Sequence, residues 1–209
     1  MSAREEILGR IRSALADRPT VPEVTWAYGQ PVSTGDLDVV ERFVERTADY
    51  RAAVQRVEAN QVGAAISAAL AAAGAGTAVA DVVVRDRWGS GIDVTWVDDT
   101  GLTATELDAV DAVVTTAAVG IANTGTIVLD HGPGQGRRAI SLVPDLHICV
   151  VSAEQIVADV PQAIARLIEN GSHVRPLTWI SGPSATSDIE LDRVEGVHGP
   201  RTLHVIVVR

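Results

Sequence analysis

Short apolar runs alternate with helical patterns along most of this chain, and that alternation restricts its fold more than any other feature. Consecutive strands separated by helices form βαβ units, whose strands run parallel and are covered on both faces. The sequence therefore predicts an α/β fold with a doubly wound, mostly parallel sheet. The expected strands are 53–57, 77–84, 92–97, 110–116, 127–129, 147–151, 177–180 and 203–208.

The interior has to be built mainly from Ala, Val, Leu and Ile. Hydrophobic residues make up 46% of the 209 residues, whereas aromatic residues make up only 3%. Small aliphatic side chains suit parallel strands packed under helices, and a chain of this length can fill one sizeable core. We expect a single α/β domain over residues 36–209, preceded by an N-terminal helix and linker over residues 1–35.

The first residues have the pattern of an amphipathic helix. Ser2 and Glu5 form a capping box before an apolar stripe that runs through Ile11. Residues 17–35 contain three prolines and few regularly spaced apolar positions, which is typical of an extended linker. Such a helix is able to dock elsewhere, including on another subunit.

Capping residues and prolines predict further helix boundaries. We expect helices at 36–47 and 61–73, the second of them capped by Asn60. Residues 154–170 also have a helical pattern, in which Pro161 stands near a helix start and divides the segment into two shorter helices.

Charge and residue usage exclude several classes of function. The formal net charge is −10, whereas duplex binding needs clustered cations, so we expect no nucleic-acid partner. The chain has no lysine, which excludes a lysine Schiff base and a phosphate-loop lysine. Cys149 is the only cysteine, so the chain cannot supply the three or four thiolates that an iron–sulfur cluster usually needs. We expect no cofactor in this chain.

The sequence also predicts where the protein resides. It has no run of roughly 20 apolar residues that would cross a bilayer, and its first residues lack the apolar middle of a signal peptide. We therefore expect a cytoplasmic protein that does not insert into membranes.

A turn rich in glycine and serine follows the strand expected at 177–180. Its backbone and hydroxyl groups could cradle an anion, and ligands gather at the carboxyl ends of parallel strands. The alternative is a capped turn whose hydroxyls only satisfy the backbone. The candidate ligand-binding residues here are Ser181, Gly182, Ser184, Thr186 and Ser187.

His198 lies between glycines beyond this turn and is the candidate acid/base residue. A carboxylate from Asp188 or Glu190 could fix the tautomer of its imidazole or raise its basicity. The alternative is a structural histidine bonded to a turn carbonyl.

Two further turns carry candidate ligand-binding residues. Thr124, Gly125 and Thr126 could form a second wall of the same pocket, or simply a tight turn. In the glycine-rich segment 132–138, Arg137 and Arg138 could hold a carboxylate or phosphate. The alternative is an exposed hairpin tip.

No metal site is predicted. His131 and His147 lack cysteine or acidic companions at metal-ligand spacing. Cys149 lies in an apolar strand, where burial as a small hydrophobic side chain is the expected role.

The C-terminal half contains four distinctive segments, at residues 122–129, 141–147, 181–190 and 196–200. Together these segments resemble the lactate-utilization protein C family. One of them has Asn123 where the resemblance leads us to expect an acidic residue. The resemblance implies a fold similar to the sugar-phosphate isomerase and coenzyme A transferase group. It also implies participation in oxidising L-lactate to pyruvate together with iron–sulfur partner proteins.

Three hypotheses about function remain open. In the first, the chain binds lactate or pyruvate, with Arg137 or Arg138 on the carboxylate and His198 assisting proton removal, while iron–sulfur partners carry the electrons. In the second, it is a self-sufficient isomerase, thioester-transfer or ligase-like enzyme acting on a phosphorylated or thioester substrate through Asp188 or Glu190. In the third, it is a non-catalytic assembly or regulatory subunit.

Overall fold

The protein is described from a computed structural model, which defines residues 2–17, 23, 32–186, 194–195 and 199–209. The chain divides into two compact units, residues 1–30 and 31–209. The first contains α1 (Ala3–Ala14), which begins with the predicted capping box: the Ser2 hydroxyl accepts from the Glu5 amide at 3.3 Å, and the Glu5 carboxylate accepts from the Ser2 amide at 2.8 Å. α1 has no buried residue.

A six-stranded sheet forms the centre of the second unit. Its strand order is β1-β12-β7-β4-β2-β3, and every pair in it is parallel. This confirms the predicted α/β class with a mostly parallel sheet. The strands are β1 (Ala53–Val57), β2 (Thr77–Ala80), β3 (Thr95–Val97), β4 (Ala112–Thr116), β7 (Leu146–Ser152) and β12 (Thr202–Val208).

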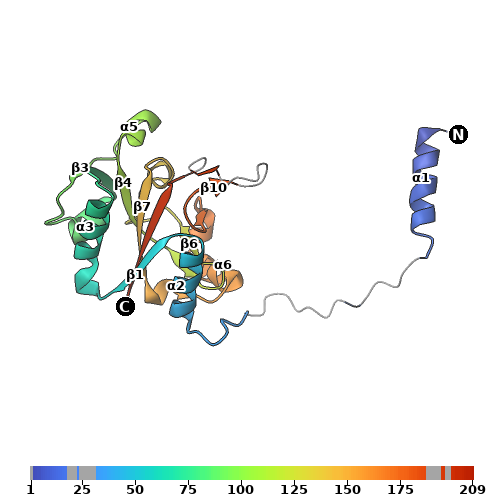
Figure 1. Ribbon diagram of the computed structural model, residues 1–209, viewed down its shortest axis with the longest axis horizontal. Helices are drawn as coiled ribbons and strands as arrows, with labels where there is room; N and C mark the ends of the chain where they lie inside the picture. Colours follow the sequence, from blue (N-terminus) through green and yellow to red (C-terminus); the bar gives the residue numbers. More distant parts are fainter. Residues whose placement is uncertain (1, 18–22, 24–31, 187–193, 196–198) are drawn as a thin grey trace. The chain divides into compact units, whose positions relative to one another are not determined.

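Helices cover both faces of this sheet. On one face, α3 (Val62–Ala72) and α4 (Val82–Trp88) pack on side chains such as Ile148 and Ile206. On the other face, α2 (Val39–Asp49) packs near β12, and α5 (Ala104–Asp108) packs near β2 and β4. Figure 1 shows α3 and α2 on opposite sides of the strands. Phe43 of α2 is fully buried, but aliphatic side chains fill most of the core, as the composition predicts.

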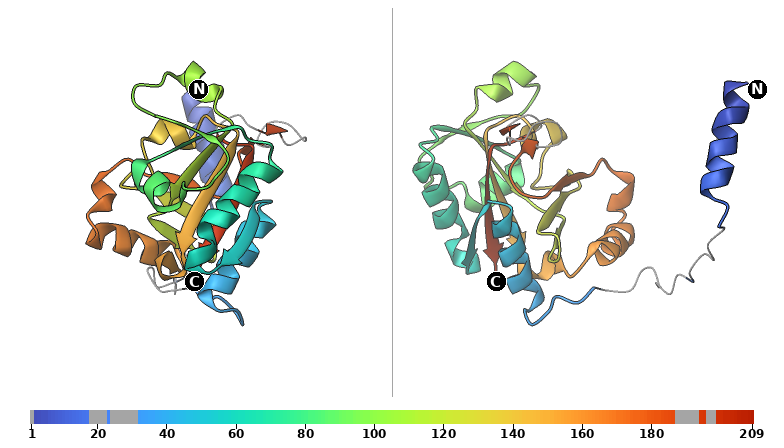
Figure 2. Two further views of the ribbon diagram at one scale, coloured as in Figure 1. Left: turned by 90° about the vertical axis from the view of Figure 1, so that its left-hand side faces the viewer. Right: turned by 45° about the vertical axis from the view of Figure 1, so that its right-hand side comes forward.

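A second, four-stranded sheet lies beyond the face that α2 covers. Its order is β8-β5-β6-β9, and it contains both parallel and antiparallel pairs. Its outer face is covered by α6 (Val160–Glu169), and Figure 2 shows it lying between the parallel sheet and α6. The strands are β5 (Val119–Ile121), β6 (Thr126–Leu129), β8 (Ile156–Val157) and β9 (Thr178–Ile180).

Short elements complete the described chain. β10 (Ala185–Thr186) and β11 (Val194–Glu195) pair antiparallel beside the larger sheets. Four 3-10 turns connect the main elements: η1 (Ala59–Gln61), η2 (Arg138–Ser141), η3 (Ala153–Gln155) and η4 (Ser172–Val174).

Several predicted boundaries were wrong. The strand expected over 77–84 ends at Ala80, because the Asp81 carboxylate accepts from the Val83 amide at 2.9 Å and starts α4. Asn60 lies inside η1 and does not cap α3.

The helical pattern expected over 154–170 also breaks. Its first part is a 3-10 turn and the short strand β8, and only α6, with Pro161 in its first turn, is helical. Before β6, the chain forms the additional strand β5, so the segment predicted as a turn is a hairpin.

None of the helices described for this chain has the length and hydrophobicity that a membrane crossing requires.

Candidate functional site

A pocket of about 220 Å³ lies between the amino-terminal ends of β7 and β12 and the turn that follows β9. It is smaller than the roughly 300–1,000 Å³ of sites for drug-sized ligands, so its volume suits a ligand of few atoms. Several lining side chains are hydroxyls, and one is an imidazole. The lining residues are Ser141, Leu142, His147, Thr178, Trp179, Ile180, Ser181, Gly182, Pro183, Ser184, Ala185, Gly199, Pro200 and Leu203.

Hydroxyl groups join two of the predicted turns at the edge of this pocket. The Ser181 and Thr126 hydroxyl oxygens are 2.8 Å apart, and the Thr126 and Thr124 hydroxyl oxygens are 2.7 Å apart. The structure thus brings together Thr124, Thr126 and Ser181. Ser184 is also a lining residue, and its amide donates to the Pro200 carbonyl at 2.8 Å.

The glycines of these turns allow close packing on α2. Gly125 has a φ of 58°, and a Cβ there would lie 2.6 Å from the carbonyl carbon of Arg46. Gly182 has a φ of 82°, and a Cβ there would lie 2.7 Å from the Cβ of Tyr50. Both residues therefore have a packing role on the C-terminal half of α2, which fixes the two turns relative to each other.

His147 is the titratable side chain among the described lining residues. It is 1% exposed, and its Nε2 lies 2.8 Å from the Thr115 hydroxyl oxygen on β4. Burial lowers the pKa of His147 to about 4, so the imidazole is neutral near pH 7. From the sequence alone, His147 was considered only as a metal ligand. The available signal was an imidazole within an otherwise apolar strand.

A network of polar groups contacts the lining residue Thr178. His131 follows β6, and its Nε2 lies 2.8 Å from the hydroxyl oxygen of Thr178, a lining residue. The neighbouring Asp130 accepts from Ser172 at 2.6 Å and from Arg175 at 3.1 Å. Burial alone would raise the pKa of Asp130, but hydrogen bonds from Ser172, Gly132 and Gln135 and the charge of Arg175 hold it below its usual value.

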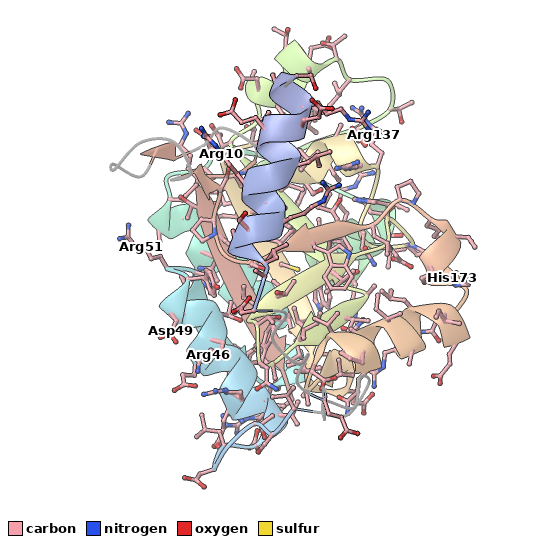
Figure 3. All side chains as sticks on the ribbon, turned by 90° about the vertical axis from the view of Figure 1, so that its right-hand side faces the viewer. Arg10, Arg46, Asp49, Arg51, Arg137 and His173 are labelled. Atoms are coloured by element: carbon pink, nitrogen blue, oxygen red, sulfur yellow. The ribbon has the colours of Figure 1, made fainter. Side chains whose placement is uncertain are left out.

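Neither of the proposed anion-binding arginines lines the pocket. The Arg137 guanidinium donates to the Asp99 carboxylate at 2.8 Å and to the Leu102 carbonyl at 2.7 Å. Figure 3 shows Arg137 well separated from Arg46 of α2. Arg138 is exposed at the start of η2. Arg138 nevertheless shares this turn with the lining residue Ser141, whose hydroxyl donates to the Arg138 carbonyl at 3.0 Å.

The remaining candidates lie outside what can be described. His198, Asp188, Glu190 and Ser187 fall outside the described residues, and for Thr186 only the backbone is described, in β10. The location also differs from the expectation, because β9 belongs to the four-stranded sheet and the pocket opens at the amino ends of β7 and β12.

Comparison with known proteins identifies the family. Residues 40–208 match the model of the LUD domain. The chain belongs to the LUD domain family. A lactate utilization protein C from Deinococcus radiodurans is 45% identical over 99% of this chain and 95% of its own length. Another from Bacillus subtilis is 38% identical over 46% of this chain and 41% of its own length.

A solved structure has the same LUD domain architecture. It is the crystal structure of a DUF162 family protein from Deinococcus radiodurans, with a TM-score of 0.70 and 40% identity over 86% of this chain and all of that chain. The LUD domain match includes every described residue that lines the pocket, whereas α1 precedes it.

Proposed function

We propose that this LUD domain protein serves lactate utilization by binding a small hydroxy- or oxo-carboxylate in the pocket beside β9. The observation that carries the proposal is the pocket itself, which combines the hydroxyls of Ser141, Thr178 and Ser181 with the imidazole of His147 in a volume of about 220 Å³. Hydroxyl groups and a neutral imidazole can both donate and accept hydrogen bonds, as a hydroxy-carboxylate requires. The names of the two relatives support the same role.

The electrons of lactate oxidation would pass to iron–sulfur partner proteins. Two electrons leave lactate when it becomes pyruvate, and this chain has a single cysteine. Burial raises the pKa of the Cys149 thiol to about 12, which disfavours the thiolate that metal ligation needs. The proposal therefore assigns substrate binding to this chain and electron transfer to cytoplasmic partners.

Titration calorimetry with L-lactate and pyruvate tests the binding step. Ser181→Ala removes a lining hydroxyl, and we expect it to weaken binding about fivefold, the usual size of one net hydrogen bond. Ser90→Ala removes a hydroxyl from an exposed serine outside the pocket, so its affinity should equal that of the wild type. Absence of binding by the wild-type protein, or equal losses in both variants, would contradict the proposal.

The partner step needs its own experiment. The tagged full chain is purified from its native cells, and the complex is examined for iron, acid-labile sulfide and cluster absorption. We expect clusters that L-lactate reduces. If the clusters stay oxidised after L-lactate is added, the result contradicts the proposal that this chain binds the substrate and its partners carry the electrons.

A further inference from the structure

Three buried side chains connect the pocket to the middle of the parallel sheet. The His147 Nε2 lies 2.8 Å from the Thr115 hydroxyl oxygen, which donates to the Cys149 Sγ at 3.6 Å. The Cys149 thiol donates to the Thr116 carbonyl at 3.8 Å. Thr115 and Cys149 are register partners on β4 and β7, and all three side chains are at most 1% exposed.

The hydrogen bond from Cys149 to the Thr116 carbonyl indicates which groups donate and which accept along this chain. A carbonyl oxygen can only accept, so the thiol proton points to Thr116 and the sulfur accepts the Thr115 proton. With the Thr115 proton on the sulfur, the Thr115 oxygen is left to accept from His147, which would place the single proton of a neutral imidazole on Nε2. Burial keeps both end groups uncharged, because it holds the Cys149 pKa near 12 and the His147 pKa near 4, so that the thiol and the neutral ring both persist at pH 7.

Nδ1 is the ring nitrogen left to a ligand. No described residue forms a hydrogen bond with Nδ1, and His147 lines the pocket. An imidazole whose proton is fixed on Nε2 presents a lone pair at Nδ1, which accepts from a hydroxyl and repels a carbonyl oxygen.

We propose that the Thr115–Cys149 relay fixes His147 as a hydrogen-bond acceptor, and that this acceptor makes the pocket select a 2-hydroxy acid over the corresponding 2-oxo acid. The inference rests on the proposed function, since it assigns the specificity of the same pocket. His147 is then a specificity-determining residue, and Thr115 and Cys149 are positioning residues. We expect L-lactate to bind about tenfold more tightly than pyruvate, because an oxo acid leaves a buried acceptor unpaired.

Nitrogen-15 NMR of the histidine rings reads the tautomer directly, without any ligand. The spectrum of the His147→Gln variant assigns the His147 signals among the five histidines. We expect the Nε2–H form in the wild type. Cys149→Ala frees the Thr115 hydroxyl to donate to Nε2 and should shift the ring toward the Nδ1–H form. Cys149→Ser keeps a group that both donates and accepts, so it should retain the wild-type tautomer.

Calorimetry of the same variants tests selection. The preference for L-lactate over pyruvate should fall to within about twofold in Cys149→Ala and persist in Cys149→Ser. Thr115→Val also breaks the relay, and its matched control is Thr95→Val at an exposed position of β3. Circular dichroism confirms that each variant is folded.

Two results would overturn the inference: an Nδ1–H tautomer in the wild type, or a lactate preference that Cys149→Ala and Thr115→Val leave unchanged. If the wild type binds neither acid, the proposed function fails and the selection fails with it. The tautomer measurement still decides separately whether the relay orients His147.

Discussion

At the scale of single residues, burial decides which polar groups can act. His147 and Cys149 are both buried on β7. Burial lowers the pKa of His147 and raises the pKa of Cys149, so both side chains are uncharged near pH 7. The pocket therefore presents uncharged donors and acceptors from its described residues, and the selectivity that we propose depends on the direction of their hydrogen bonds. Asp130, in contrast, is kept ionised by its hydrogen-bond donors. It precedes His131, whose imidazole contacts the hydroxyl of the lining residue Thr178.

Protein stability should depend on pH through His147. Its pKa is about 4 in the folded state against 6.5 when unfolded, so the unfolded chain binds the extra proton first as the pH falls. Stability should then decrease by about 3 kcal/mol between pH 6.5 and pH 4 on account of this one group, with no further loss below pH 4. Urea unfolding at a series of pH values measures the slope.

Comparison with variants isolates this contribution. His147→Gln should flatten the pH dependence, whereas His173→Gln, at an exposed position, should leave it as in the wild type. The same slope in His147→Gln and the wild type would show that the imidazole does not carry the effect.

At the scale of elements, the position of α2 depends on the two glycine turns. Its backbone approaches Gly125 so closely that no side chain fits between them, and Gly182 meets Tyr50 at the end of the helix. Asn123 adds a hydrogen bond from its amide to the Val32 carbonyl at 3.1 Å. These contacts bring the segments before and after α2 against the four-stranded sheet, and so set the shape of the pocket.

Gly125→Ala should destabilise the protein strongly. A Cβ would be strained at positive φ and would overlap the Arg46 backbone, so we expect a loss of about 3 kcal/mol in the free energy of unfolding. Gly35→Ala is the matched control, because Gly35 has a φ of 73° and nothing within 4 Å of the added carbon. It should cost only about 1 kcal/mol. If chemical denaturation gives the same loss of unfolding free energy for both variants, the close contact between Gly125 and α2 does not contribute to stability.

At the scale of the whole molecule, the parallel sheet joins the first and last strands of the larger unit. β12 lies between the edge strand β1 and β7, so the last strand of the chain is an interior strand of the sheet. The pocket uses this arrangement, because it takes Leu203 from β12, His147 from β7 and Ser181 from beyond β9. A truncation that removes β12 would therefore take away an interior strand, separate β1 from β7, and remove the lining residue Leu203 from the pocket.

Removal of residues 1–30 should leave the larger unit folded. These residues form a separate compact unit, and α1 buries none of its side chains. We expect the thermal midpoint of the shortened protein to lie within about 2 °C of the full chain, since a change of 1 kcal/mol corresponds to about 2–4 °C at this size. A decrease of more than about 5 °C in scanning calorimetry would contradict this. Loss of partner binding with an unchanged midpoint would assign α1 a docking role.

Features that depend on neighbouring residues could be predicted from the amino-acid sequence. Capping boxes at Ser2 and Thr103, the helical stripe of α2 and the apolar runs of β4, β7 and β12 are local patterns, because a helix or a cap is stabilised by contacts within about four positions. From these patterns the α/β class could be predicted, while the motifs of the C-terminal half indicated the family.

The contacts between distant segments, in contrast, depend on the fold of the whole domain. Ser181 and Thr126 are 55 positions apart, and His147 and Thr115 are 32 apart, so their contacts depend on strand order and register. A shift of one residue in β7 would turn His147 to the opposite face of the sheet. Long-range packing also places the Arg137 guanidinium where it donates a hydrogen bond to the Asp99 carboxylate. The strand register could not be predicted from the local sequence, because the packing of the whole core fixes that register.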